Sequence, residues 1–237
     1  MQTKYWVVPD FDNIFKPSDA PVKKLKESLD RMGLDFVDIY MVHGHIHPQS
    51  IKTVAKGMAE CVEQGLAKAI AVANYSTDDM IKFAEELEKY NVPLCANQVE
   101  YHPLRRYPET SGLLAACKER GIVMQSYSSL AQGRLTGKYT KDNPPPKSHR
   151  FSSIPMEEVE PMLEVLRSIG EKHGVPISAV SLNYNMSKGV CPVVGVRHEK
   201  MAEENSKAYG WRLTEDEIRE IEKHSFEGNK TSLWQQN

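Results

Sequence analysis

The sequence predicts an α/β fold, an incomplete (β/α)8 barrel of the TIM type with about six parallel strands and outer helices. Short apolar runs alternate with longer amphipathic segments along the chain, which is typical of repeated βα units. A length of 237 residues with 40% hydrophobic residues suits one domain with one core. The apolar runs are two short of a closed eight-stranded barrel, and they span residues 4–8, 36–42, 67–72, 93–99, 122–127 and 191–195.

Segments with apolar residues at three- and four-residue spacing are predicted to be the helices that cover this sheet. They span residues 18–32, 51–64, 77–90, 109–120 and 156–173. Ser76 and Thr214 are expected helix starts, because their hydroxyl groups can cap the first turn. Residues 128–153 are rich in Gly, Pro, Lys and Ser and are too long for an ordinary connection. We predict that they form a mobile loop over the open end of the sheet.

The composition favours a small-molecule partner. The net charge is −2, and acidic and basic residues are interleaved, which leaves no block of charge to bind nucleic acid or a membrane surface. The four cysteines lie far apart without metal-ligand spacing, so we expect reduced thiols and no metal site. No apolar run approaches the roughly 20 residues of a membrane span. We therefore expect a cytoplasmic protein.

Polar residues near the carboxyl ends of the predicted strands are the candidate site, because parallel barrels collect functional groups there. They are His43, Asn74, Gln98, Tyr101, His102, Tyr127 and Arg197. A buried amide without a partner costs about 1 to 3 kcal/mol, so Gln98 in a strand favours a ligand. Lys4 lies near the beginning of the first predicted strand. Its ammonium could have a functional partner there, or it could simply reach water.

Several segments resemble motifs of the aldo-keto reductase family. In chain order they are TKYW at residues 3–6, MGLDFVDIYMVHGH, KAIAVANYS, NQVEYHP, QSYSSLAQG, and VVGVRHEKMAEEN followed by LTEDEIREI. They cover nearly the whole chain. The resemblance implies that residues 1–237 form a single truncated barrel domain of this family, without the first two βα units of its barrel.

The resemblance also implies a role for each matching residue. Lys4 would lower the pKa of a catalytic tyrosine, and His43 would orient and polarise a substrate carbonyl. Asn74 and Gln98 would bind the nicotinamide carboxamide, and Tyr127, flanked by Ser128, would stack on the nicotinamide ring. The adenine ribose and its phosphate would be bound by Arg197, Lys200, Glu204 and Asn205. The implied cofactor is NADP(H).

The sequence also departs from the family pattern. The first two βα units carry an aspartate and the tyrosine that donates a proton to the carbonyl, and neither unit is found here. Ala73 replaces the serine beside the cofactor-binding asparagine, and VVGV at residues 193–196 replaces a phosphate-binding lysine and serine. We therefore expect a defective catalytic tetrad and weakened cofactor binding.

Some candidates also have a structural interpretation. Tyr101 and His102 could be catalytic groups of the same pocket, or they could form a turn fixed by Pro103. A surface salt bridge to Glu199 or Glu203 would explain Arg197 without a ligand. His45 and His47 follow His43 in a turn, and we interpret them as loop residues.

Two functions follow. The first is an NADP-dependent oxidoreductase that acts on a carbonyl or alcohol. The second is a redox-neutral dehydratase, isomerase or cyclase that acts on a hydroxylated substrate through His, Lys and Tyr acid-base groups and needs no nicotinamide. Because six strands leave two sheet edges open, we also expect a homodimer that covers the missing barrel segment.

Overall fold

A computed structural model gives the fold, and it describes residues 1–6, 9–146 and 154–228. The described residues form two compact units. The first unit contains residues 1–6, 9–99 and 112–123, and the second contains residues 100–111, 124–146 and 154–228.

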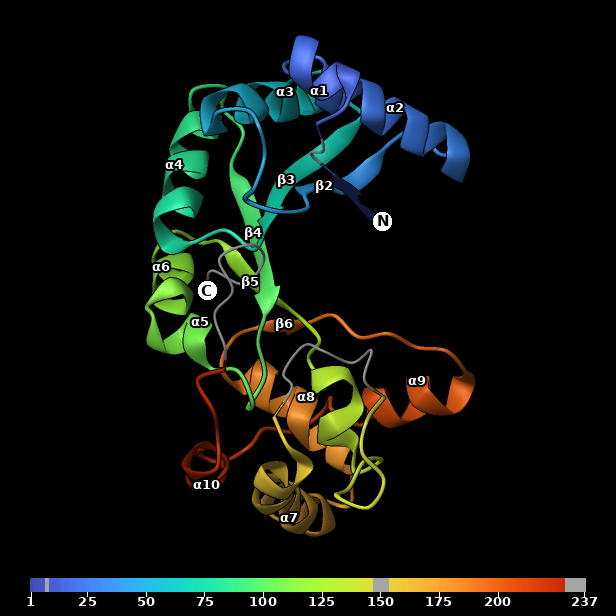
Figure 1. Ribbon diagram of the computed structural model, residues 1–237, viewed down its shortest axis with the longest axis vertical. Coiled ribbons are helices and arrows are strands. Elements are labelled where there is room, and N and C mark those ends of the chain that lie inside the picture. The colour runs from blue at the N-terminus through green and yellow to red at the C-terminus, as the bar shows by residue number, and fades with distance from the viewer. Residues whose placement is uncertain (7–8, 147–153, 229–237) are drawn as a thin grey trace. The chain divides into compact units, whose positions relative to one another are not determined.

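The first unit is an alternation of strands and helices, with all its strand pairs parallel. Its elements are β1 (Gln2–Tyr5), α1 (Phe11–Phe15), α2 (Ala20–Met32), β2 (Val37–Val42), α3 (Ile51–Glu63), β3 (Ala67–Ala73), α4 (Thr77–Glu88), β4 (Leu94–Glu100, whose last residue belongs to the second unit) and α6 (Leu113–Glu119). Strand β1 pairs with β2, β2 with β3 and β3 with β4. Helices α2, α3 and α4 follow one another along the outer side of these strands (Figure 1).

The sheet of the first unit is strongly curved. Lys4 on β1 and Gln98 on β4 meet with 2.7 Å between Nζ and Oε1. In a flat sheet, three strand spacings of about 4.8 Å would put β1 and β4 about 14 Å apart. Two side chains that stand upright on such a sheet would not meet across that distance. The contact therefore requires the strands to curl as in a barrel, with both side chains on the concave face.

Small side chains line the same concave face. Strand register places Lys4 beside Met41, Met41 beside Ala71, and Ala71 beside Ala96, and neighbouring partners in a sheet point to the same side. Met41, Ala71, Ala73 and Ala96 form one buried cluster. Alanines on the inner face leave room for long polar side chains to approach one another there.

The opposite face of the sheet packs under the helices. Tyr40 of β2 is fully buried and donates its hydroxyl to the carbonyl of Pro21 in α2, at 3.2 Å. Helix α3 approaches α2 so closely that a Cβ atom at Gly57 would lie 2.5 Å from the carbonyl oxygen of Ser18. Only glycine fits this crossing without a shift of the backbone.

The second unit is largely helical. Its elements are α5 (Tyr107–Thr110), β5 (Val123–Tyr127, whose first residue belongs to the first unit), the 3-10 turn η1 (Ala131–Thr136), α7 (Met156–His173), α8 (Ile177–Ser187), β6 (Cys191–Pro192), α9 (Glu199–Ser206) and α10 (Glu215–Lys223). Strand β5 pairs in parallel with β6. Helix α8 lies at the centre of this unit and packs against α7, α9 and η1.

Asn183 of α8 anchors the connection between α9 and α10. Its Nδ2 group donates to the carbonyls of Ala208 at 2.9 Å and Trp211 at 3.0 Å. Its Oδ1 accepts from the backbone N–H of Leu213 at 3.1 Å and from the hydroxyl of Ser187 at 3.0 Å. One fully buried side chain therefore satisfies several backbone groups of a segment without regular structure.

Helix α10 is fixed to α7 through Glu217. Thr214 and Glu217 form a reciprocal capping box, and Glu217 also accepts hydrogen bonds from Lys172 at 2.6 Å and His173 at 2.9 Å. Burial raises the pKa of Glu217, but the hydrogen bonds from Lys172, the Thr214 backbone and His173 outweigh it and lower the pKa to about 2. The carboxylate is therefore ionised throughout the physiological range.

The described strands are six and parallel, as predicted, but their ends differ. The first strand spans Gln2–Tyr5 and not residues 4–8, of which residues 7 and 8 lie outside the described residues. The last spans Cys191–Pro192 and not residues 191–195. That the sequence lacks two βα units of a complete barrel, and that it forms a single domain, stay predictions.

The helices differ more. The predicted helix over residues 109–120 is wrong as one element, because Gly112 adopts φ 91° and separates α5 from α6. Helices α1, α8 and α9 are not predicted from the sequence. The predicted loop over residues 128–153 contains η1, and its residues 147–153 lie outside the described residues. The predicted starts at Ser76 and Thr214 are confirmed as N-caps of α4 and α10.

We predict that Asn183→Ala lowers the free energy of unfolding by about 3 kcal/mol, because it leaves several buried backbone groups without partners. Asn185→Ala is the matched control. Asn185 is a fully buried asparagine on the same helix whose Nδ2 donates to the carbonyl of Ser181. Urea unfolding of both variants should show the smaller loss for Asn185→Ala, and equal losses would contradict the anchoring role of Asn183.

Candidate active site

The structure brings four of the predicted site residues together in the first unit. Lys4 is the penultimate residue of β1, His43 and Asn74 directly follow β2 and β3, and Gln98 lies near the end of β4. The predicted strand over residues 4–8 put Lys4 at the amino end of its strand. The observed strand puts it at the carboxyl end, where barrels carry their functional groups.

Lys4 and Gln98 are the directly bonded pair of this group. The ammonium of Lys4 donates to Oε1 of Gln98 at 2.7 Å. Gln98 is 2% exposed, and burial lowers the pKa of Lys4 from its ordinary value. The amide oxygen offsets part of the cost of burying the ammonium, because it replaces one hydrogen bond to water.

His43 is held by its backbone and its ring. Its backbone N–H donates to the carbonyl of Tyr5 at 2.9 Å, and its ring meets the ring of Trp6 edge-on with 4.8 Å between centroids. Burial, and next the positive charge of Lys4, lower the pKa of His43 to about 4. The imidazole is therefore neutral near pH 7 and can offer one N–H donor and one nitrogen acceptor.

Asn74 adopts a left-handed backbone conformation with φ 61°. It is almost fully buried, and its backbone N–H donates to the carbonyl of Gln98 at 2.9 Å. Asparagine tolerates this conformation better than most residues. The backbone bond therefore places the two predicted carboxamide-binding residues next to each other at the ends of β3 and β4.

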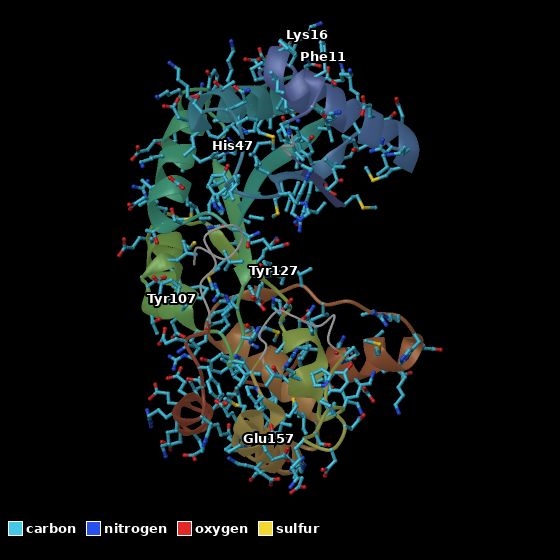
Figure 2. The ribbon with its side chains drawn as sticks, viewed as in Figure 1. Phe11, Lys16, His47, Tyr107, Tyr127 and Glu157 are labelled. Carbon is cyan, nitrogen blue, oxygen red and sulfur yellow. The ribbon has the colours of Figure 1, made fainter. Side chains whose placement is uncertain are left out.

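His47, labelled in Figure 2, has a structural role. Its Nδ1 donates to the carbonyl of Gln49, so in the neutral ring Nε2 accepts from the hydroxyl of Tyr75 at 3.1 Å. Burial lowers the pKa of His47 and of His45. Both bonds of His47 serve the loop after β2, which agrees with its interpretation as a loop residue.

A supporting network behind β1 was missed from the sequence. The fully buried side chain of Asn13 in α1 accepts from the hydroxyl of Tyr5, the neighbour of Lys4. The Asn13 carbonyl accepts from Nε2 of Gln49 at 2.6 Å. The network ties the end of β1 to the loop that follows His43. A single Asn in a short turn gives no periodic signal, although Asp10 as an N-cap could have indicated a helix start.

Tyr101 lies in the core of the second unit. It is fully buried, donates its hydroxyl to Oε2 of Glu109 at 2.9 Å and stacks on Tyr184 with 6.3 Å between ring centroids. Burial, and next the nearby Tyr184 and Glu109, raise the pKa of Tyr101. A phenol with a raised pKa and a hydrogen-bonded hydroxyl favours the structural role of Tyr101, in the turn before Pro103, over a catalytic role.

His102 lies beside a buried charge pair. Its Nε2 is 3.4 Å from Oε1 of Glu100, and Oε2 of Glu100 is 3.5 Å from Nε of the fully buried Arg105. The carbonyl of Pro103 accepts from the backbone N–H of Phe226 at 3.0 Å. These contacts favour the turn over a catalytic site for His102.

The residues predicted to stack on the nicotinamide ring end β5. Tyr127, labelled in Figure 2, is its last residue and is half-buried. Ser128 follows with φ 51°. Ser129 turns its hydroxyl back to the carbonyl of Ser126 at 2.8 Å. The turn therefore leads the chain away from the strand directly after Tyr127.

The residues predicted to bind the adenine ribose and its phosphate lie on or just before α9. Arg197 is exposed, and within the described part of the chain it forms no ion pair with Glu199 or Glu203. Lys200 lies 3.8 Å from Glu204 on the exposed side of the helix. The buried Nδ2 of Asn205 has no hydrogen-bond partner among the described residues.

These groups fit a phosphorylated nucleoside. Among the described residues the guanidinium of Arg197 has no carboxylate partner, which suits it to a phosphate, and the buried amide donor of Asn205 has no acceptor there. Residues 1–6, 9–146 and 154–228 contain no cluster of three or more His, Cys, Asp or Glu side chains that could hold a metal ion. None of the helices in these ranges is long and apolar enough to cross a membrane.

Residues 17–225 match the model of the Aldo/keto reductase family. The match covers most of the chain, so the chain belongs to the aldo/keto reductase family. Lys4 precedes the matched stretch, and its assignment therefore depends on the TKYW motif and on the observed geometry.

Curated relatives of the chain are named as reductases. It is 33% identical over 217 residues to the chloroplastic pyridoxal reductase of Arabidopsis thaliana, covering 90% of this chain and 59% of that protein. It is 29% identical over 223 residues to the L-glyceraldehyde 3-phosphate reductase of Escherichia coli K12, covering 89% and 64%. The chain thus spans about six tenths of the length of these relatives. Their names lend no support to the redox-neutral alternative.

Solved structures share the fold. A glycerol dehydrogenase from Gluconobacter oxydans superposes with a TM-score of 0.81 at 23% identity, covering 98% of this chain and 75% of that one. A Bombyx mori aldo-keto reductase in complex with NADP gives 0.73 at 23% identity, covering 96% and 68%. At this identity the likeness shows the fold alone.

We predict that the His43 imidazole titrates near pH 4, as followed by its carbon-bound ring protons in NMR. Because this pKa lies below the ordinary 6.5, the unfolded chain binds the extra proton first, so His43 destabilises the fold as pH falls from about 6.5 to 4. Replacement by Gln should remove that part of the pH dependence of unfolding. A midpoint near 6.5 would show that His43 is neither desolvated nor close to a charged Lys4.

Proposed function

We propose that the chain carries an NADP(H)-dependent oxidoreductase site that acts on a carbonyl or alcohol substrate. The observation that carries the proposal is the group in the first unit: an ammonium, a neutral imidazole and a buried amide at the carboxyl ends of β1, β2 and β4. Membership of the aldo/keto reductase family and the reductase names of the relatives support it.

Each residue receives a role that its environment permits. The neutral imidazole of His43 donates a hydrogen bond to the substrate oxygen, and the nearby charge of Lys4 stabilises negative charge that develops on that oxygen. Asn74 and Gln98 hold the nicotinamide carboxamide, and Tyr127 with Ser128 covers the ring. The adenine ribose and its phosphate are held by Arg197, Lys200, Glu204 and Asn205.

The cofactor would supply the hydride in the reducing direction and accept it in the other. The groups of this chain bind and orient the two molecules and place a proton donor at the substrate oxygen. The Lys4 ammonium, whose pKa is lowered by burial, gives the substrate oxygen its proton and becomes an amine, while the neutral His43 only donates a hydrogen bond to that oxygen. Tyr101 and His102 are not needed as proton donors in this scheme.

We also keep the homodimer as a proposal. Strand β1 pairs with β2 on one side, and no strand of the described residues pairs with its other side. An uncovered strand edge is a natural place for a second chain to add.

The function is tested by fluorescence titration with NADPH and by the rate of NADPH-dependent reduction of a panel of aldehydes and ketones. His43→Gln should lower kcat by about 100-fold or more, because it removes the N–H donor that the imidazole places at the substrate oxygen. His224→Gln is the control. This half-exposed histidine lies at the end of α10, and among the described residues its ring has one charged neighbour, with 3.9 Å between its Nε2 and Oε1 of Glu220. Failure of the wild-type chain to bind NADPH, or an unchanged rate in His43→Gln, would contradict the proposal.

A further inference from the structure

Gln98 has its amide oxygen committed to Lys4. The 2.7 Å contact joins a cation that can only donate to an oxygen that can only accept, so the orientation of the amide is fixed. Its Nε2 group can then act only as a donor toward any other partner. Gln98 is almost fully buried, so water competes little for this bond.

The proton on Lys4 influences the rest of the Gln98 side chain. A positive donor on the amide oxygen draws electron density from the amide and strengthens its N–H groups as donors. When Lys4 loses its proton, this polarisation ends and the amide is no longer held by a charge. The donor strength of Nε2 therefore follows the protonation of Lys4.

We propose that Gln98 is the positioning residue of Lys4 and that it transmits the protonation of Lys4 to the nicotinamide subsite, so that NADP(H) binds more tightly while Lys4 carries its proton. The inference rests on the proposed function, because it takes Gln98 as a ligand of the carboxamide. Linkage makes the effect reciprocal: bound cofactor holds the proton on Lys4 more strongly.

The surroundings of Lys4 make the coupling measurable. His43, which directly follows the neighbouring strand β2, is a titratable side chain that interacts electrostatically with Lys4. Met41, Ala71 and Ala96, which share its register, carry no charge. Since the pKa of His43 is about 4, its imidazole is already neutral at pH 7 and stays neutral at higher pH.

The test uses the full chain with isotope-labelled lysine and follows the Lys4 side chain by NMR from pH 7 to 11. In Gln98→Met the ammonium loses its acceptor while burial remains, so the Lys4 pKa should fall further. In Gln98→Glu the added carboxylate should raise it by about 1 to 3 pH units. Gln2→Met is the matched control, because Gln2 lies on the same strand and contacts Sδ of Met41.

The second arm measures the Kd of NADP+ by Trp fluorescence over the same pH range. In the wild-type chain and in Gln2→Met, Kd should rise at least about fivefold as Lys4 loses its proton. In Gln98→Met, NADP+ should bind more weakly at every pH, and its Kd should not change as Lys4 loses its proton. Added NADP+ should raise the Lys4 pKa only where Gln98 is present.

Three results overturn the inference in distinguishable ways. Identical Lys4 titration in the wild-type chain and Gln98→Met refutes the positioning role. A Kd that does not change with Lys4 protonation refutes the transmission. If no variant binds NADP+ at any pH, the proposed function and the transmission fail together, whereas the NMR arm still decides whether Gln98 positions Lys4.

Discussion

The hydrogen bond between Lys4 and Gln98 is the interaction on which the site of the first unit depends. It joins the outermost of four strands across the concave face, so it can form only when the sheet is curled. The alanines of β3 and β4 permit the approach because they occupy little of the space between the two long side chains. The same bond offsets the burial of a cation, which in turn lowers the pKa of His43.

The second unit relies on buried polar groups. Helix α8 is buried along most of its length, including Ser181, Asn183 and Asn185, and its Asn183 amide bonds backbone groups of the segment between α9 and α10. The cluster of Tyr101, Glu109 and Lys188 also joins separate elements, since Lys188, directly after α8, contacts Glu109 of α5 and Glu222 of α10. Such networks specify one packing, because any other arrangement would leave charges buried without partners.

These features explain what the sequence could predict. Residues 36–42, 67–72 and 93–99 read as strands because both faces of a parallel sheet are covered in this family of folds, and their apolar runs are continuous. Thr214 indicated the start of α10, because its hydroxyl can cap the first turn of a helix. Helix α8 gave no amphipathic pattern, since its polar residues are as buried as its apolar ones, and Gly112 broke a periodic pattern that looked continuous.

The site could be predicted only in part, because local patterns show where a strand ends but not which side chains meet across the sheet. His43 and Asn74 follow apolar runs, so their positions at strand ends could be inferred. The bond of Lys4 to Gln98 depends on curvature across four strands, which no local pattern reports, and the polar residues Gln2 and Thr3 gave no sign that the first strand begins before Lys4. Tyr101 and His102 share the strand-end signal of the other candidates, and only their contacts with Glu109 and Glu100 separate them.

A double-mutant cycle measures the contact of Lys4 with Gln98 across the curled sheet. The free energies of unfolding of the wild-type chain, Lys4→Met, Gln98→Met and the double variant give the interaction energy of the two side chains. A direct bond between a partly buried ammonium and a buried amide predicts a coupling of about 1.5 to 3 kcal/mol. Losses that add to within about 0.5 kcal/mol would mean that Lys4 and Gln98 do not meet, and that neither the curvature nor the site is held as described.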